Sequence, residues 1–538
     1  MAQDQPVGHD ALVVDGAFGC GYLVRAGTNT APGLVAGWPV HKLGSLTYHL
    51  HPRTRLHAAV RDGGPGRVVI LGHPVDVRAG LGDGDLICED VLDSWTDQGL
   101  DAAVRHLAYL GGRWTAFLDA VVAPGEPGRV TVVPDCQATQ AVFYSTYKGV
   151  ALGSQPALVA QAVDTGPDEA AQRMWDALRK ARRTGVIFHP GTMTTHEGVL
   201  PLVPNHLLRL SVAGAAVSVE HERFWPFQDR VERTDTRAVT SEFIDYFREH
   251  TRLLCDFGTP VISLTGGMDS RTSLAAALPH LHEDSFTFTY FNPRDGLTKK
   301  GAADDVFEAN AIAFGVGVQH RVLRWRRPRR GSAFDEIIAR TYPVQRASTG
   351  AAHAMWADLP HDIIHLQSIG AEVGTTFFTK RPEGPITADR LLEIVSTRAD
   401  LGQEMARAAF GDYLDYAQFT HEAIRGYDPH DVFYWEQRMG KWGYQKFQDG
   451  DFSHRMLLPF NDRGLIELMQ SLPYPQRESK VLLHALLATV PAPATPAPAD
   501  EARIGWRDVV AARPHVRPRL ARLRDRLPRR QTTQRSMP

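Results

Sequence analysis

Short apolar runs alternate with Gly, Pro and Asp over the first 230 residues of the 538-residue chain. Their spacing is typical of sheets, and turn-forming residues bound each run. The runs are ALVVDGAF, GRVVIL, GRWTAFLDAVV, RVTVVP, QAVFYSTY and GVALG. Helical spacing interrupts them in LDAAVRHLAYLGG, near residues 100–112, and in DEAAQRMWDALRKARRTG, near residues 168–185. We expect a sandwich of two sheets with flanking helices.

After Pro226 the pattern changes to alternating strands and helices. VISL, residues 261–264, is a wholly apolar run of the kind that parallel sheets bury, and an amphipathic helix is expected before it, over residues 236–256. The further expected elements are a strand SFTFTYF at 285–291, a helix around DDVFEANAIAFG, a run VQHRVLRW, a strand DIIHL at 362–366, and helices up to about residue 488. This order predicts a parallel sheet with right-handed crossovers.

Composition places the chain among ordinary soluble proteins. It has 43% hydrophobic and 22% charged residues, which excludes a disordered or collagen-like chain as a whole. Lys and Arg number 59 against 61 Asp and Glu, and the resulting net charge of −2 argues against broad nucleic-acid binding. We therefore expect no nucleic-acid partner.

Cysteine usage and the first residues predict a cytoplasmic protein. The four Cys residues form neither a CxxC pair nor a disulfide framework, which favours a reducing compartment. The start, MAQDQPVGHD, lacks the basic and apolar regions of a signal peptide. No apolar run reaches the ~18 residues that a membrane span needs. We expect no membrane association.

Residues 489–538 are predicted to be a linker and a disordered tail. PAPATPAPAD at 491–500 has the composition of a Pro/Ala linker. Between Arg513 and Arg535 the tail holds nine Arg and one acid, Asp525. Binding to an anionic surface or partner is the alternative to a solvated tail.

The most informative stretch is VISLTGGMDSRTSLAAAL, residues 261–278, where a buried strand leads directly into a helix. Gly266 and Gly267 let the backbone bring amide N–H groups close to an anion, and the helix N-terminus adds partial positive charge. Thr265 and Ser270 offer hydroxyl donors, and Asp269 suits a magnesium ion that bridges phosphate oxygens. Packing, with Asp269 and Ser270 only capping the helix, is the alternative. The chain has neither GxxxxGK[ST] nor GxGxxG at this place.

TGGMDSR resembles the SGGxDS signature of the PP-loop ATP pyrophosphatases, which cleave ATP between its α and β phosphates and transfer AMP to a carbonyl oxygen. The flanking pattern is similar to that of the asparagine synthetase class, which includes β-lactam synthetases and lasso-peptide cyclases. GGRWTAF, VTVVPDCQATQAVFYS, GVALGSQPAL and LPLVPNHLLRL, followed by RFWP, resemble the amidotransferase-like domain of that class. The similarity extends over roughly residues 10–488.

The resemblance implies an α/β protein of two domains. Residues 1–230 are expected to form an N-terminal Ntn-hydrolase-like αββα sandwich, related to class II glutamine amidotransferases. Residues 236–488 are expected to form a PP-loop domain with a parallel sheet, of the adenine nucleotide α-hydrolase type. Glutamine-hydrolysing members carry an N-terminal Cys, whereas this chain has Ala2. Cys20 is expected to be a buried small hydrophobe, so no glutamine hydrolysis is expected.

The resemblance also assigns roles to residues. Thr265, Gly266, Gly267, Asp269, Ser270 and Arg271 are expected to bind ATP and pyrophosphate. In HLQSIGAEVGTTFF, Glu372 takes the position of a second magnesium-binding acid and Val373 replaces the acid after it. Lys480 corresponds to a Lys that stabilises the transition states. Glu436 corresponds to the acid that, with a Tyr, deprotonates the amine, but Ile369 stands at the Tyr position. Asp305 matches an acid that often precedes the helix after the second strand.

These residues predict an ATP- and Mg²⁺-dependent, AMP-forming ligase that adenylates a carboxylate and couples it to an amine. Its substrates are expected to be small molecules or peptides, with a second copy of the chain as a candidate partner. A structural role is the alternative for each candidate: solvation or helix capping for Glu372, the surface for Lys480, an ion pair with Arg438 or Lys441 for Glu436. For the whole chain, the alternatives are a non-catalytic nucleotide-binding protein and a PP-loop enzyme that activates another carbonyl.

Overall fold

The structure is a computed structural model that describes residues 9–26, 33–123, 126–181, 188–213, 216–293, 300–344, 349–395 and 403–490. Residues Met1–Pro491 form one compact unit. The predicted linker and basic tail lie outside the described residues from position 491 onward, and so does Ala2.

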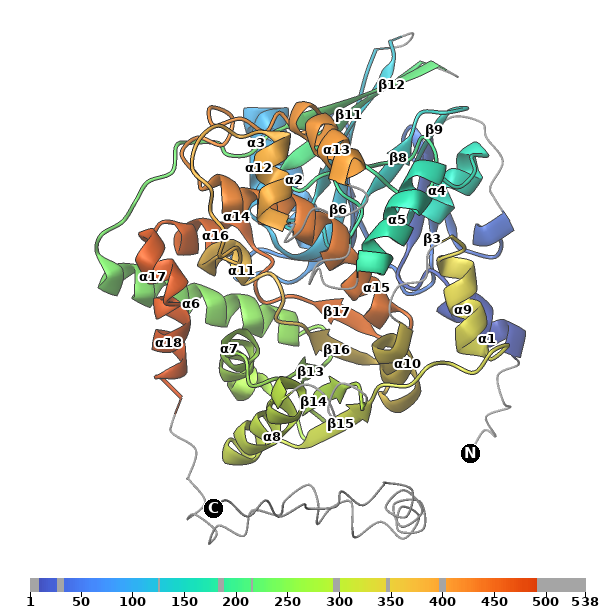
Figure 1. Ribbon diagram of the computed structural model, residues 1–538. Helices are drawn as coiled ribbons and strands as arrows, with labels where there is room; N and C mark the ends of the chain where they lie inside the picture. The colour runs from blue at the N-terminus through green and yellow to red at the C-terminus, as the bar shows by residue number, and fades with distance from the viewer. Residues whose placement is uncertain are drawn as a thin grey trace, which may run out of the picture. The chain divides into compact units, whose positions relative to one another are not determined.

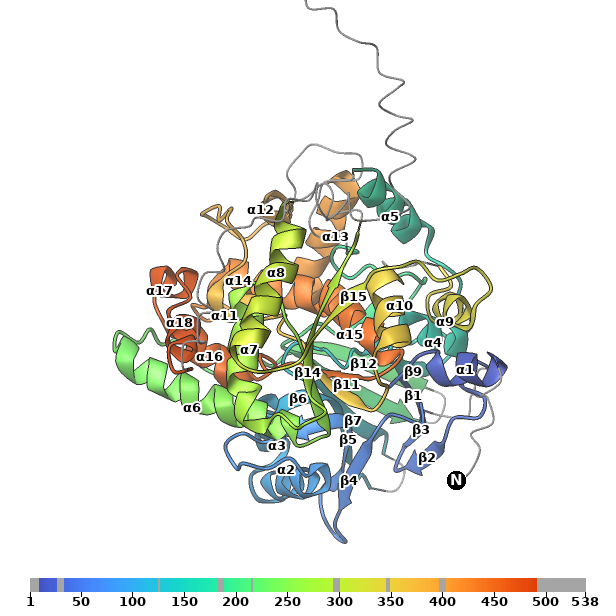
Figure 2. The same ribbon diagram turned by 90° about the horizontal axis from the view of Figure 1, so that it is seen from below.

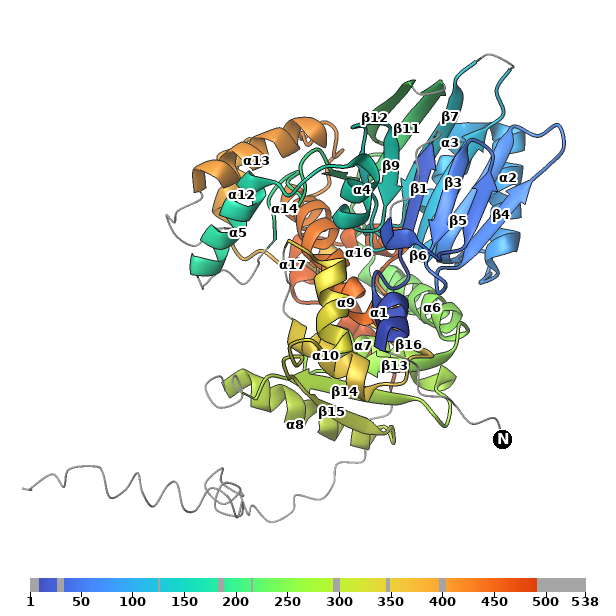
Figure 3. The ribbon, with the colours of Figure 1, turned by 90° about the vertical axis from the view of Figure 1, so that its right-hand side faces the viewer.

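Two antiparallel sheets make up the N-terminal part of this unit (Figures 1 and 3). The first sheet contains β1 (Tyr22–Ala26), β2 (Val40–Leu43), β3 (Leu46–Leu50), β8 (Phe143–Ser145), β9 (Val150–Gly153) and β10 (Leu200–Pro201) in the order β10-β8-β9-β1-β3-β2. The second contains β4 (Leu56–Val60), β5 (Gly66–Val75), β6 (Gly111–Ala120), β7 (Gly128–Pro134), β11 (His206–Ala213) and β12 (Ala216–Arg223) in the order β12-β11-β7-β6-β5-β4.

Helices cover both outer faces of these sheets. Side chains from the two sheets, such as Tyr48 and Phe117, form a buried core between them. A second core packs the outer face of the β4–β12 sheet against α2 (Gly84–Gln98) and α3 (Leu100–Ala108). A third packs the other sheet against α4 (Pro156–Val163), and α5 (Glu169–Ala181) follows. The predicted sandwich with flanking helices is confirmed, although α3 ends at Ala108 because β6 begins at Gly111.

One predicted strand is a helix. The run ALVVDGAF falls largely in α1 (His9–Gly16). Val13 packs against Phe334 and Ile337 of α9 (Ala333–Thr341), so a tertiary contact decides the structure of a segment whose Val residues favour a strand. Cys20 likewise lies outside a strand, in a turn with φ of 54°, but it is buried as expected.

A five-stranded parallel sheet forms the C-terminal part. Its strands are β13 (Thr259–Ser263), β14 (Phe286–Phe291), β15 (His320–Arg324), β16 (Ile363–Leu366) and β17 (Arg455–Leu457) in the order β15-β14-β13-β16-β17. The helices around the sheet are α6 (Thr236–Cys255), α7 (Met268–Ala277), α8 (Lys300–Gly315) and α10 (Thr349–Asp358). In Figure 2, α7 and α8 lie on one side of β14 and α10 on the other. The predicted parallel sheet is confirmed.

Strand β17 was not predicted, because its three residues are too few to give a pattern. The expectation of helices alone after residue 366 is therefore wrong at this point, where Met456 pairs with His365. The remaining helical elements are η1 (Gly33–Val35), η2 (Leu278–His280), α11 (Glu372–Thr375), α12 (Ala388–Val395), α13 (Gln403–Tyr416), α14 (Pro429–Phe433), the π-helix η3 (Tyr434–Gly443), α15 (Tyr444–Asp451), α16 (Arg463–Gln470), α17 (Tyr474–Glu478) and α18 (Val481–Leu487).

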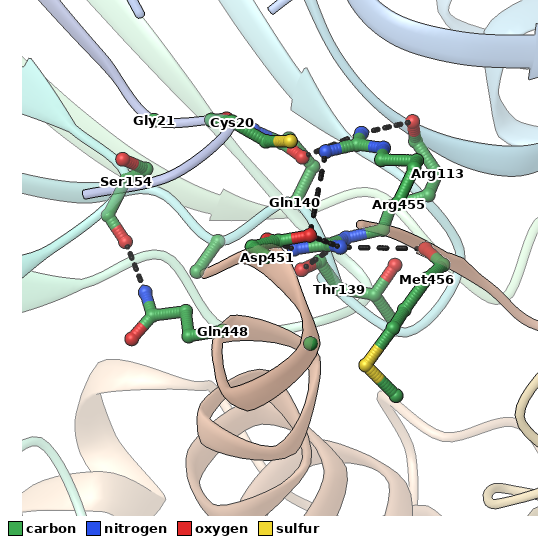
Figure 4. A network of polar contacts seen from close by, with 12 residues as sticks. Cys20, Gly21, Arg113, Thr139, Gln140, Ser154, Gln448, Asp451, Arg455 and Met456 are labelled. Atoms are coloured by element: carbon green, nitrogen blue, oxygen red, sulfur yellow. Dashed lines mark hydrogen bonds and ion pairs between the residues drawn. The ribbon is translucent and has the colours of Figure 1, made fainter. Parts of the chain in front are cut away.

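A buried ion pair connects the sandwich to the C-terminal elements (Figure 4). Arg113 on β6 donates from Nη1 and Nη2 to the two carboxylate oxygens of Asp451, at 2.8 and 2.6 Å, and both side chains are only 3% exposed. Beside it, Arg455 donates to Gln140, and Gln448 donates to the carbonyl oxygen of Ser154. Neither charge reaches water, so each depends on the other.

No helix in the described part of the chain is both long enough and apolar enough to cross a lipid bilayer.

The substitution Asp451→Asn is expected to lower the free energy of unfolding by about 3 kcal/mol or more, because it leaves the Arg113 guanidinium buried without its counter-charge. Asp93→Asn is the matched control, because Asp93 pairs with Arg61 at the surface, where both side chains are 51% exposed. Its loss is expected to stay below about 1 kcal/mol. Urea unfolding followed by circular dichroism measures both, and equal losses would contradict the anchoring role of Asp451.

Candidate functional site

The predicted site residues gather at the carboxyl edge of the parallel sheet. Strand β13 leads into the 265–270 loop, and its neighbour β16 leads into the segment that carries Glu372. Carboxyl ends of adjacent parallel strands meet at one edge, which is where open α/β sheets bind ligands. Val261 pairs with His365 in register, so the two segments leave the sheet side by side.

The glycine loop is braced by its own hydroxyl groups. The N–H of Thr265 donates to Ser270 Oγ at 3.1 Å, and the N–H of Gly267 donates to Thr265 Oγ1 at 3.1 Å. The two hydroxyls expected to face a phosphate thus hold the loop in shape here. An added Cβ on Gly266 would lie 1.9 Å from Glu308 Oε2, so the exposed Glu308 side chain would have to move to admit it. The contact of Glu308 with this loop was not predicted.

Asp269 and Lys480 form an ion pair across the site. Lys480 Nζ lies 3.0 Å from Asp269 Oδ1, and the side chains are 29% and 21% exposed. Asp269 is in the first turn of α7, whereas Lys480 immediately precedes α18 with φ of 54°, a conformation that non-glycine residues rarely adopt. The structure thus brings together two residues that are 211 positions apart.

Glu372 joins this pair. Its Oε2 accepts the N–H of Gly370 at 3.2 Å. Burial raises the pKa of Glu372, and the charge of nearby Asp269 raises it further, while Lys480 and a hydrogen bond with Tyr434 act in the opposite direction. Val373, which replaces the following acid, is fully buried in the core under the helices.

The donor set suits a divalent cation with oxygen ligands. Asp269 and Glu372 come from separate segments, and the charge of Lys480 acts on both of them. Burial raises the pKa of Glu372, and the charge of Asp269 raises it further. Two carboxylates that leave the other positions to phosphate oxygens and water are typical of magnesium sites at phosphates. Among the described residues, no group of three or more His, Cys, Asp or Glu is arranged to hold a metal.

An aromatic and cationic border of the site was not predicted. Tyr434, at the start of η3, hydrogen-bonds both Glu372 and Arg438, and burial raises its pKa. The Arg438 guanidinium lies over the rings of Trp442, at 4.1 Å, and Phe377, at 4.8 Å. The sequence signal was the aromatic-rich run FYWEQRMGKWGY, which reads equally well as a core helix.

Glu436 has the surroundings of a buried ion pair, not of a free base. Arg223 donates to its two oxygens at 2.7 and 2.9 Å, and Asn205 and Tyr413 donate to it as well. Its side chain is 0% exposed. The expected partners Arg438 and Lys441 are replaced by Arg223 of β12, which the sequence spacing could not indicate.

Two other candidates lie at the surface. Arg271 is exposed at the start of α7. Asp305 is exposed inside α8, which begins five residues earlier at Lys300, so it does not precede the helix as the matching acid of the family often does. Ile369, at the position of the family's Tyr, packs against the core that includes Val373.

A scan against models of protein families and a search of curated proteins each find no significant match to the chain. The resemblance to the asparagine synthetase class therefore rests on the motifs themselves.

Glu372→Gln is expected to raise the thermal midpoint of the nucleotide-free protein at pH 7. The folded state raises the pKa of this carboxyl, so the folded protein holds the proton more tightly than the unfolded chain and loses stability as pH rises through the raised pKa. The advantage of the variant should vanish below the ordinary pKa of 4.5. Scanning calorimetry between pH 4 and pH 7 measures it, with the exposed Glu393→Gln as control. A variant that is less stable at pH 7 would show that the charge is not costly.

Glu436→Gln is expected to lower the free energy of unfolding by about 3 kcal/mol, because Arg223 keeps a buried charge without a counter-ion. Glu242→Gln is the matched control, since Glu242 makes a similar two-pronged pair with Arg233 at the surface. It should cost less than about 1 kcal/mol. Urea unfolding decides: a Glu436 variant as stable as the wild type would restore this residue as a candidate base.

Proposed function

We propose that this protein is an ATP-dependent, AMP- and pyrophosphate-forming ligase that adenylates a carboxylate and joins it to an amine. The observation that carries the proposal is the meeting of Asp269, Glu372 and Lys480 at the carboxyl edge of the parallel sheet, beside the glycine loop. Three separate segments contribute these charged residues. Packing or helix capping alone would not require them to lie together.

The proposal includes the finer fold relationships. The helix–sheet–sheet–helix layering of the N-terminal part is consistent with an Ntn-hydrolase-like domain, and the TGGMDSR loop after a central parallel strand is consistent with a PP-loop domain. The proposal includes no glutamine hydrolysis, because Ala stands at position 2 where the glutamine-hydrolysing members of the class carry Cys, so the amine is taken up as such.

In the first step a carboxylate oxygen attacks the α-phosphorus of ATP. The bond from that phosphorus to the oxygen bridging to the β-phosphate breaks, and pyrophosphate leaves. The backbone of the 265–270 loop and the N-terminus of α7 bind the phosphates. Lys480 stabilises the charge that grows on phosphate oxygens. Magnesium, which Asp269 and Glu372 would hold, supplies Lewis-acid stabilisation of the same oxygens when bound.

In the second step an amine attacks the acyl carbon, and AMP leaves from the tetrahedral intermediate. Lys480 again faces the developing negative charge. Arg438, which lies over Trp442 and beside Tyr434, adds positive charge that suits anionic reactants. No base is assigned for the amine, because Glu436 is enclosed by Arg223 and Tyr413.

A non-catalytic nucleotide-binding protein is the second candidate. Two observations favour it: Glu436 is locked in an ion pair, and Val373 stands buried where the family has an acid. Such a protein would bind ATP through the same loop without turnover.

Exchange of labelled pyrophosphate into ATP, with a panel of carboxylic acids, tests the proposal. The wild type should exchange with at least one acid. Asp269→Ala and Lys480→Met should each slow exchange by about 100-fold or more, as expected for the loss of one preorganised charge. Glu283→Gln is the control, because this exposed carboxylate precedes β14 at the opposite edge of the sheet.

The outcomes separate the candidates. Binding of ATP without exchange for any acid would favour the non-catalytic protein. Exchange that survives Asp269→Ala within about twofold would refute the assigned role of Asp269.

A further inference from the structure

A second charged cavity lies away from the carboxyl edge of the parallel sheet. It has a volume of about 740 Å³ and is bordered by α2, α3, β11 and β12. Tyr109, Phe224 and Phe227 supply aromatic rings, and Arg78 and Arg105 supply charge. This volume is typical of small-molecule sites. The lining includes neither Asp269 nor Lys480.

The two arginines are held in place by aromatic rings. The Arg78 guanidinium lies 4.2 Å from the centroid of the Tyr109 ring, and that of Arg105 lies 4.4 Å from the centroid of Phe227. The two rings are themselves neighbours, with centroids 6.0 Å apart. A guanidinium stacked on a ring keeps its N–H groups available around its edge, which suits recognition of phosphate or carboxylate.

The turn that carries Arg78 is also rigid. Asp76 and Leu81 exchange both backbone hydrogen bonds, at 2.8 and 2.9 Å. Asp76 Oδ1 accepts the backbone N–H groups of Arg78 and Ala79 at 2.9 and 3.0 Å. The position of Arg78 at the cavity is therefore fixed before any ligand arrives.

The acids of the cavity are already engaged. Asp76 accepts backbone N–H groups through Oδ1, and its Oδ2 lies 3.3 Å from His106 Nε2. Glu222 and Asp101 both face Arg209, and Arg223 is taken by Glu436. Among the described residues, Arg78 and Arg105 have neither a hydrogen-bond nor an ion-pair partner for their guanidinium groups. Both guanidinium groups therefore keep their N–H groups available at one aromatic wall, while the buried carboxylates Asp462 and Glu467 offset part of the charge of Arg78.

We propose that this cavity binds a small organic phosphate, with Arg78 and Arg105 holding the phosphate group. Two guanidinium charges match the nearly double charge of a phosphomonoester at neutral pH. The volume exceeds what a bare phosphate ion fills, and the ring of an aromatic ester would contact Phe224 and the outer faces of the stacked guanidinium groups. The site is independent of the ligase reaction.

Isothermal titration of the full-length protein with phenyl phosphate tests the inference. The wild type should bind it saturably, with an affinity that falls as salt is added. Arg78→Gln and Arg105→Gln should each weaken binding at least tenfold. Arg61→Gln, at the surface pair with Asp93, and Asp269→Ala should change it by less than twofold, the latter because phosphate at the glycine loop would depend on Asp269 and not on Arg105.

Further arms make the result decisive. Arg105→Lys retains the charge and should recover part of the affinity, and thermal unfolding checks that every variant is folded. Benzoate and inorganic phosphate should bind more weakly than phenyl phosphate. Absence of saturable binding, equal binding by Arg105→Gln, or benzoate binding as tightly as phenyl phosphate would each overturn the proposal, whatever the pyrophosphate exchange assay shows.

Discussion

The parallel pairing of β13 with β16 is the constraint on which the candidate site depends. Because Val261 lies opposite His365, the glycine loop and the Glu372 segment leave the sheet at the same edge and at the same height. Burial raises the pKa of Glu372, and the charge of Asp269 on the neighbouring segment raises it further. Lys480, in its unusual backbone conformation, partly offsets this excess of negative charge.

The buried ion pairs away from this edge have a structural role. Two buried ion pairs, Arg113–Asp451 and Arg223–Glu436, connect the sandwich to α15 and η3 of the C-terminal part. Such pairs contribute little net stability compared with apolar packing, but they are intolerant of mispairing. The ion pairs therefore determine which surfaces pack together. In this way they also position η3, on which Tyr434 lies beside Glu372.

Local patterns predicted most of the framework. Helix α6 and strands β13, β14 and β16 stand where periodicity placed them, because their apolar faces are buried in the manner that periodicity assumes. The prediction of a strand for ALVVDGAF is wrong because Val13 packs on α9, more than 300 positions away. Strand β17 was not predicted because three residues are too few to show a periodic pattern. The meeting of Asp269, Glu372 and Lys480 could be inferred only from the resemblance, since no spacing relates them. Neither periodicity nor the resemblance could predict the Arg223–Glu436 pair or the aromatic wall with Arg78, Arg105 and Tyr109. Each arises from contacts between segments that no motif or spacing connects.

The buried ion pairs make the C-terminal part of the chain depend on the N-terminal sandwich. Asp451 and Glu436 belong to the C-terminal part of the chain, yet the arginines that hydrogen-bond both of their carboxylate oxygens come from β6 and β12. Arg455 of β17 lies a further 3.9 Å from Asp451. A chain that began near residue 236 would lack Arg113 and Arg223, and it would expose the aromatic surface around Trp435 that rests on Trp225. The N-terminal sandwich thus supplies the cations that balance buried acids of the C-terminal part.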